Sequence, residues 1–183
     1  PDERHIIEDD IKTAFKLIEE YKKELNIEGN PVESPINNYK GYLTLISEYK
    51  PHQATLVPDS SSQLTSDHGW DISQSEQLID FATEIRKSSN VCSIFIDTDI
   101  AENEFELILN KNINAIELYT GPYAEAYLDK RESDVANEIS KIQNLANIAK
   151  GKGLKVNAGH DLNIMNLPAL RELDLIDEVS IGH

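Results

Sequence analysis

Short apolar runs alternate with longer segments of helical period along the whole sequence. The runs are rich in β-branched residues and end in polar or glycine residues, so we predict strands at 26–28, 54–57, 91–96, 115–119, 154–157 and from about 178. The segments between them repeat their apolar residues with the period of a helix, and we predict helices at 8–25, 39–49, 73–85, 101–110, from 120 to about 150, and 162–173. Alternation of strand and helix implies an α/β fold with a parallel sheet.

Three local patterns make finer predictions. Ser73 and Glu76 have the spacing of a capping box and are expected to open the helix that follows. Lys22 and Lys23 are expected in the last turn of the first helix, where they complement the helix dipole. The run 91–96 is nearly all apolar, which is typical of a strand covered on both faces.

Polar residues at the strand ends favour a closed barrel over an open sheet. In a barrel the strand ends converge on one mouth, where the active site lies. The polar residues at the predicted strand ends are Glu28, Asp59, Asp97, Glu117, His160 and His183. No strand leads into the glycine-rich loop of a dinucleotide-binding open sheet. A complete barrel needs about eight βα units and ~250 residues. The 183 residues therefore predict one domain, 1–183, that is a (β/α)8 TIM barrel without its first two βα units and its C-terminal tail.

Charge and composition exclude several kinds of partner. The net charge of -16 and the pI near 4.6 argue against nucleic acid, whose phosphates need a basic surface. Small phosphorylated ligands are compatible with this negative charge, because backbone N–H groups at helix N-termini can hold phosphate in an acidic protein. No apolar run approaches the ~20 residues of a membrane span, and we expect no secretory signal. The single cysteine, Cys92, lies in an apolar run, which predicts a buried thiol and a reducing, cytoplasmic compartment.

Several strand ends carry candidate chemistry, each with an alternative. His160 follows two small residues, where its imidazole can transfer protons or satisfy a loop hydrogen bond. Glu28 and Glu117 each follow an isoleucine in a predicted strand. Each can be a proton-transfer group with a raised pKa, or one half of a structural ion pair. The segment 180–183 is compatible with a backbone phosphate site, and the loop 65–71 with a substrate lid or a plain surface loop. The five histidines lack metal-ligand spacing, so no metal is expected.

The order of these motifs resembles that of the pyridoxine 5′-phosphate synthases over the whole chain. The most specific of them is Leu-Lys-Val-Asn-Ala-Gly-His at 154–160. The others are Arg-His-Ile at 4–6, Asn-Ile-Glu at 26–28, Lys-Pro-His at 50–52 with Leu-Val-Pro at 56–58, the segments 65–69, 95–97 and 116–124, and Ile-Gly-His at 181–183.

The resemblance implies an enzyme of vitamin B6 biosynthesis. Such transferases condense 1-deoxy-D-xylulose 5-phosphate with 3-amino-2-oxopropyl phosphate, giving pyridoxine 5′-phosphate, phosphate and water. The resemblance also implies that neither metal nor organic cofactor is needed and that the enzyme is a homo-oligomer, often an octamer. Proton transfers and dehydrations of this kind need several acid–base groups and a dry pocket.

The resemblance further implies a role for individual residues. Glu28 matches the family's general base, His160 its proton donor, and Glu117 the glutamate that stabilises charged intermediates. The matches to substrate contacts are His5 and Thr65 for the deoxyxylulose phosphate, and Asp161, Gly182 and His183 for the amino-ketone phosphate. Asp161 stands where the family often has glycine, so a backbone contact would survive the change while a side-chain carboxylate would repel phosphate. A further catalytic histidine and an arginine of the family fall before Pro1.

Two other functions remain open on the sequence alone. Another phosphate-binding barrel, such as a sugar-phosphate epimerase or isomerase, would share the phosphate loop and the carboxylates, but usually gathers metal ligands at the strand ends. A non-catalytic phosphate-binding module would not need Glu28, Glu117 and His160 together.

Overall fold

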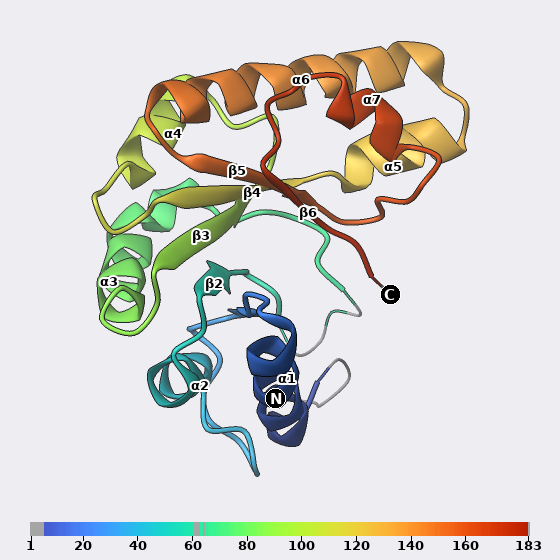
Figure 1. The fold of residues 1–183 in the computed structure, drawn as a ribbon. Coiled ribbons are helices and arrows are strands. Elements are labelled where there is room, and N and C mark those ends of the chain that lie inside the picture. Colours follow the sequence, from blue (N-terminus) through green and yellow to red (C-terminus); the bar gives the residue numbers. More distant parts are fainter. Residues whose placement is uncertain (1–5, 61–62, 64, 183) are drawn as a thin grey trace.

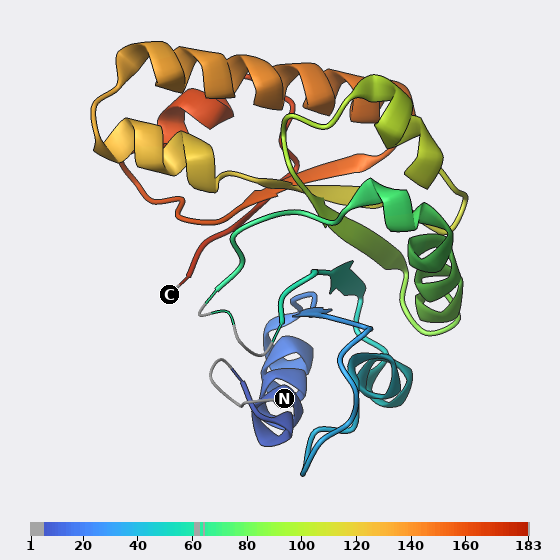
Figure 2. The ribbon, with the colours of Figure 1, turned by 180° about the vertical axis from the view of Figure 1, so that it is seen from behind.

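Six parallel strands form one sheet whose spatial order equals their order in the chain. The computed structural model describes residues 6–60, 63 and 65–182. The strands are β1 (Asn26–Gly29), β2 (Gln53–Leu56), β3 (Val91–Ile96), β4 (Ala115–Tyr119), β5 (Lys155–Gly159) and β6 (Glu178–Ser180). The sheet curls into an open half-barrel (Figures 1 and 2), and within the described residues β1 and β6 each pair with a single neighbour. The α/β class and the parallel sheet are therefore confirmed.

Helices connect the strands, as the alternation predicts. They are α1 (Glu8–Tyr21), α2 (Tyr42–Tyr49), the 3-10 turn η1 (Ile72–Gln74), α3 (Ser75–Ile85), α4 (Glu102–Ile108), α5 (Gly121–Leu128), α6 (Glu132–Gly151) and α7 (Leu167–Arg171). Of the helices in the described part, none is long and apolar enough to cross a membrane.

The convex face of the sheet holds the hydrophobic core. Directly paired residues of neighbouring strands point to the same face, so the register divides the side chains into two sets. The convex set is apolar and fully buried: Ala54, Leu56, Cys92, Ile94, Ile96, Ile116, Leu118, Val156 and Ala158. Helices α3, α4 and α6 pack over this face (Figures 1 and 2). Each large aliphatic side chain buried here contributes ~1.5–3 kcal/mol of hydrophobic stabilisation.

The concave face carries buried polar residues, and β3 is covered on this face as well as on the convex one. Ser93 and Phe95 point inward, while only the alternate residues of β3 face the helices. Thr55 and Asn157, also fully or almost fully buried, lie on the same inner face. Every residue of β3 from Cys92 to Ile96 is buried, which confirms the prediction of a strand covered on both faces. The inner face is thus built for polar chemistry.

Backbone turns correct several predicted helix ends. The first helix stops at Tyr21 because Lys22 adopts φ 52°, so Lys22 and Lys23 lie beyond the last turn. The long predicted helix is two helices, since Lys130 has φ 57° between α5 and α6. Left-handed residues of this kind commonly end helices.

The capping box predicted at Ser73 and Glu76 is wrong. The backbone N–H of Ser73 donates instead to Oδ1 of Asp71, 2.9 Å away, and this bond caps the short η1 turn that precedes α3. Ser73 therefore lies inside that turn, and α3 begins at Ser75 without a side-chain cap.

Cys92 lies fully buried on the convex face. Burial raises the pKa of its thiol to about 12. A thiol of this kind packs as a small hydrophobe and is not a nucleophile at neutral pH, which confirms the prediction from its apolar neighbours.

Candidate active site

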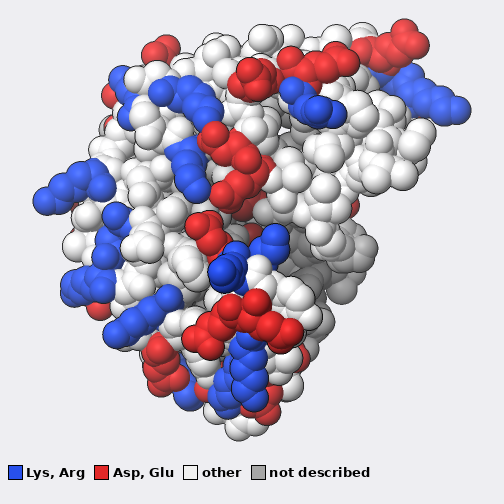
Figure 3. Space-filling model, in the orientation of Figure 1, with Lys and Arg blue, Asp and Glu red and all other residues white. Residues whose placement is uncertain are grey.

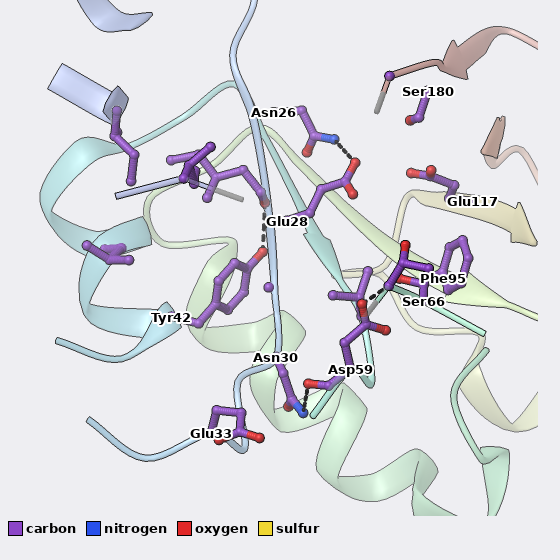
Figure 4. Close-up of a pocket in the computed structure, with 18 of the residues that line it drawn as sticks. Asn26, Glu28, Asn30, Glu33, Tyr42, Asp59, Ser66, Phe95, Glu117 and Ser180 are labelled. Carbon is purple, nitrogen blue, oxygen red and sulfur yellow. Dashed lines mark hydrogen bonds between the residues drawn. The ribbon is translucent and has the colours of Figure 1, made fainter. Parts of the chain in front are cut away.

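A pocket of about 1470 Å³ lies on the concave face, at the carboxyl ends of the strands. Its lining includes Glu28 of β1, Glu117 of β4 and His160 just after β5, with Asp59 and Thr65 from the loop after β2. Figure 4 shows the two glutamates pointing toward one another across this space. Because parallel strands end on the same side, residues more than a hundred positions apart in the sequence come together here.

Glu28 is held by a neighbour on its own strand. Nδ2 of Asn26 donates to Oε1 of Glu28 at 2.9 Å (Figure 4), as the two-residue spacing on a strand allows. The carboxylate is reached by solvent inside the hollow but is enclosed by its walls. This burial raises the pKa of Glu28, the negative charge of Asp59 raises it further, and the Asn26 bond partly opposes both. The result is a carboxylate that is a stronger base than a surface glutamate.

Asp59, which the sequence placed among the polar residues of the mouth without a specific role, contributes to the site. Oγ of Ser66 donates to Oδ2 of Asp59 at 2.5 Å, and Nδ2 of Asn30 donates to the Asp59 carbonyl at 2.9 Å (Figure 4). Its Oδ1 is buried without a hydrogen-bond partner among the described residues. Its place shortly after β2 gave the signal, because the other polar residues expected at the mouth also lie at or near strand ends. Asp59 is the charged neighbour that strengthens Glu28 as a base.

Glu117 is a buried carboxyl group. Only 3% of the residue is exposed, and its Oε2 has no hydrogen-bond partner within the described part of the chain. Burial raises the pKa of Glu117 to about 8, with a second contribution from the charge of Glu28 and an opposing hydrogen bond from Ser180. At neutral pH Glu117 therefore favours the neutral acid, which ionises readily once a positive charge appears beside it.

Gly159 makes room for that carboxyl group. A Cβ atom at this position would lie 2.1 Å from Oε1 of Glu117. A larger residue at the end of β5 would therefore force the Glu117 carboxyl group to move, so glycine before His160 leaves this carboxyl group its place in the pocket.

His160 is fixed from both sides of its ring. Its Nε2 lies 3.0 Å from Oγ1 of Thr65, and its Nδ1 lies 2.9 Å from Oδ2 of Asp161. The ring of Tyr119 meets it edge-on, with 5.2 Å between the ring centroids. Oγ1 of Thr120 lies 2.7 Å from each of the carbonyl oxygens of Gly159 and His160 and shares its one proton between them, which fixes the backbone beneath the ring. His160 makes loop contacts, but its ring also lines the pocket, as proton transfer requires.

Most of the residues predicted from the sequence meet in this one pocket. Its lining contains Glu28, Thr65, Glu117, His160, Asp161 and Gly182. His5 and His183 lie outside the described residues, so their predicted substrate contacts stay predictions. Among the described residues, no group of three or more histidine, cysteine, aspartate or glutamate side chains has the arrangement of a metal site.

The loop after β2 is anchored to the sheet at its far end. The backbone N–H of Gly69 donates to Oδ1 of Asp97 at 2.9 Å, and Nε1 of Trp70 donates to the Leu56 carbonyl at 2.9 Å. A Cβ at Gly69 would lie 2.3 Å from the backbone nitrogen of Asp97. Asp97, which the sequence placed at the mouth, therefore holds this loop rather than lining the main pocket.

Positive charge is scarce in the described lining. Lys12 and Lys40 are its lysines, and both are engaged in ion pairs with acidic residues of α1 and α2, including Glu8. On the face shown in Figure 3, acidic and basic side chains are interspersed and form no basic patch. Anions in this pocket would depend on backbone N–H groups, on hydroxyls and on histidines.

Comparisons with known proteins agree on one family. A family model described as "Pyridoxal phosphate biosynthesis protein PdxJ" matches residues 1–183. The chain is 41% identical over 187 residues to the pyridoxine 5′-phosphate synthase of Chelativorans sp. (strain BNC1), an alignment that covers 100% of the chain and 72% of the relative. It is 42% identical over 188 residues to that of Xanthomonas axonopodis pv. citri (strain 306), with 100% and 71% covered. It is 38% identical over 187 residues to that of Brucella anthropi, with 100% and 72% covered.

Proposed function

The chain belongs to the family of the pyridoxal phosphate biosynthesis protein PdxJ, and from that premise we propose that its pocket closes the ring of pyridoxine 5′-phosphate. The substrates are 1-deoxy-D-xylulose 5-phosphate and 3-amino-2-oxopropyl phosphate, and the products are pyridoxine 5′-phosphate, phosphate and water. The observation that carries this proposal is the convergence of Glu28, Glu117 and His160 on one pocket. A sugar-phosphate epimerase and a passive phosphate binder are left without a supporting observation.

Glu28 is the general base of this proposal. Ring closure requires removal of protons from carbon and nitrogen atoms of the condensed substrates, and a base works best when its pKa is closer to the working pH. The enclosing walls and Asp59 raise the pKa of Glu28 in that direction. Asn26 holds the carboxylate in place without neutralising it.

His160 is the proton donor, and Glu117 stabilises positive charge. Loss of a hydroxyl group as water requires protonation of the leaving oxygen, and loss of phosphate is assisted by a hydrogen bond to its oxygen; an imidazolium N–H supplies both. The amine of one substrate and the ketone of the other pass through an iminium, and a carboxyl group beside this cation gives up its proton and stabilises it. Glu117 starts with a pKa of about 8, so the iminium itself triggers its ionisation.

Substrate contacts follow from the same pocket. We assign Thr65 and His5 to the deoxyxylulose phosphate, and Gly182, His183 and the backbone of Asp161 to the amino-ketone phosphate. A backbone contact suits Gly182, which lies exposed at the pocket with nothing within 4 Å of its missing Cβ. No resident metal or organic cofactor has a part in this chemistry.

The half-barrel is part of a closed (β/α)8 barrel in this proposal. Two further βα units would pair with the edges of β1 and β6 and would bring the histidine and arginine that the family places before Arg4. We also propose that residues 1–183 belong to one domain, that the enzyme is a cytoplasmic homo-oligomer, and that neither nucleic acid nor membrane is its partner.

The test is to incubate the complete gene product with both substrates and with each alone. We expect pyridoxine 5′-phosphate, identified by absorbance and by mass, with one phosphate released for each product molecule and nothing from either substrate alone. A folded protein that releases phosphate from neither mixture would contradict the proposal.

A further inference from the structure

Asp161 stands beside the proposed proton donor and contacts the imidazole nitrogen opposite to the one that meets Thr65. Oδ2 of Asp161 lies 2.9 Å from Nδ1 of His160, and Oγ1 of Thr65 lies 3.0 Å from Nε2. The three side chains thus form a continuous hydrogen-bonded series of carboxylate, imidazole and hydroxyl. The His160 side chain is only 12% exposed within this series, while the Asp161 side chain is 47% exposed.

The chemistry of the three groups fixes where the protons lie. An ionised carboxylate can only accept hydrogen bonds, so Nδ1 of His160 must carry a proton. In the neutral ring the lone pair is then on Nε2, where the Thr65 hydroxyl donates to it. In the charged ring Nε2 carries the transferable proton, and the carboxylate stabilises the imidazolium. One nitrogen is therefore committed to Asp161, and the other is presented to Thr65.

We propose that Asp161 is a positioning residue that selects the Nδ1–H tautomer of His160 and directs its Nε2 toward the substrate. This inference rests on the proposed role of His160 as the proton donor. It gives the Asp161 side chain a role beside the backbone contact with the amino-ketone phosphate that is proposed for this position. A partly exposed carboxylate would repel that phosphate, whereas here it is engaged by the imidazole.

The backbone is shaped to make this contact. Neighbouring side chains of an extended strand point in opposite directions, so adjacent residues do not normally meet. His160 and Asp161 have φ of 96° and 56°, conformations that non-glycine residues rarely adopt, and this turn brings the two side chains together. Thr120 holds the His160 carbonyl, and Nδ2 of the buried Asn166 donates to the Asp161 carbonyl at 3.1 Å. Such strain persists only where surrounding bonds maintain it.

Two variants of the complete gene product test the inference. Asp161→Gly removes the carboxylate at a backbone position that glycine tolerates, and Asp161→Asn keeps the shape but can donate to Nδ1 and so permit the opposite tautomer. The matched control is Asp174→Gly, because Asp174 has φ 52°, is exposed and lies outside the pocket. The readouts are the His160 tautomer, from ¹H–¹⁵N spectra of protein with labelled histidine assigned with His160→Asn, and separate kcat and KM values.

We expect the parent and Asp174→Gly to show His160 as a single Nδ1–H tautomer, and both Asp161 variants to lose it. We also expect kcat to fall ~10- to 100-fold in both Asp161 variants, a part of the ~10²–10⁴ that general acid–base catalysis contributes, with KM values within about threefold. An unchanged tautomer in Asp161→Gly would overturn the inference, as would a raised KM for the amino-ketone phosphate with unchanged kcat. The tautomer is measured without substrates, so a parent that makes no pyridoxine 5′-phosphate would refute the proposed function and leave this test intact.

Discussion

Replacing Glu117 with glutamine should remove a pH-dependent loss of stability. The pKa of Glu117 is raised from 4.5 to about 8 in the folded protein. Between these values the folded protein keeps a proton that the unfolded chain has released, so the free energy of unfolding must fall as pH rises through this window. Stability from this group is fully present below pH 4.5 and lost by about pH 8.

The size of the effect follows from the same numbers. Each pH unit between the two values is worth ~1.4 kcal/mol, so the window from 4.5 to about 8 gives an upper bound of ~5 kcal/mol. Glu117 and Glu28 repel each other when both are charged, so part of this free energy belongs to the pair. Removing either charge removes the repulsion on the other. The cause is burial with an unpartnered Oε2, a situation that penalises the charged form alone.

Urea unfolding of the complete gene product at several pH values between 5 and 8.5 would measure this directly. Glu117→Gln should match the parent at pH 5, where the parent carries the neutral acid, and should exceed it increasingly toward pH 8.5. The control is Glu19→Gln, since Glu19 is an exposed glutamate of α1. Parallel stability curves for Glu117→Gln and the parent across the range would refute the view that Glu117 is buried with a raised pKa.

Four further changes test the site and the sheet. Glu28→Gln and His160→Asn should each lower turnover by ~10²–10⁴ with little effect on the unfolding temperature, and turnover within twofold of the parent would remove either residue from its role. Gly159→Ala should cost ~10²-fold in turnover, because its Cβ would displace the Glu117 carboxyl group by meeting Oε1 at 2.1 Å; an unchanged rate would mean that this carboxyl group need not sit where it does. Expressed alone, residues 1–183 should aggregate in size-exclusion chromatography because β1 and β6 are open edges, and a monomeric, cooperatively unfolding and active species would contradict this.

The strand pattern of the sequence predicted the sheet because strand length and apolar content are local properties. All six predicted strands are present, with ends that differ by a few residues. The helix ends were less predictable, because they depend on left-handed residues such as Lys22 and Lys130. Lysine has no special preference for that conformation, so its own identity gives no signal.

The inner face and its charges were only partly predictable. Glu28, Glu117 and His160 could be singled out because each ends a strand, and parallel strands end on one side. Which side of β3 faces the pocket could not be read from the sequence, because the residues of both faces are buried from Cys92 to Ile96. The Asp161 contact could not be foreseen, since two adjacent residues meet only through an uncommon backbone turn.

The central claim is that ring closure takes place between Glu28, Glu117 and His160. The most direct test is a crystal structure of the complete gene product carrying Glu28→Gln, soaked with both substrates. We expect the condensed substrates to lie in the pocket on the concave face, with an iminium or amine nitrogen beside Glu117 and a leaving oxygen within about 3 Å of Nε2 of His160, a hydrogen-bonding distance. Substrates bound elsewhere, or bound here with His160 and Glu117 both out of reach, would contradict it.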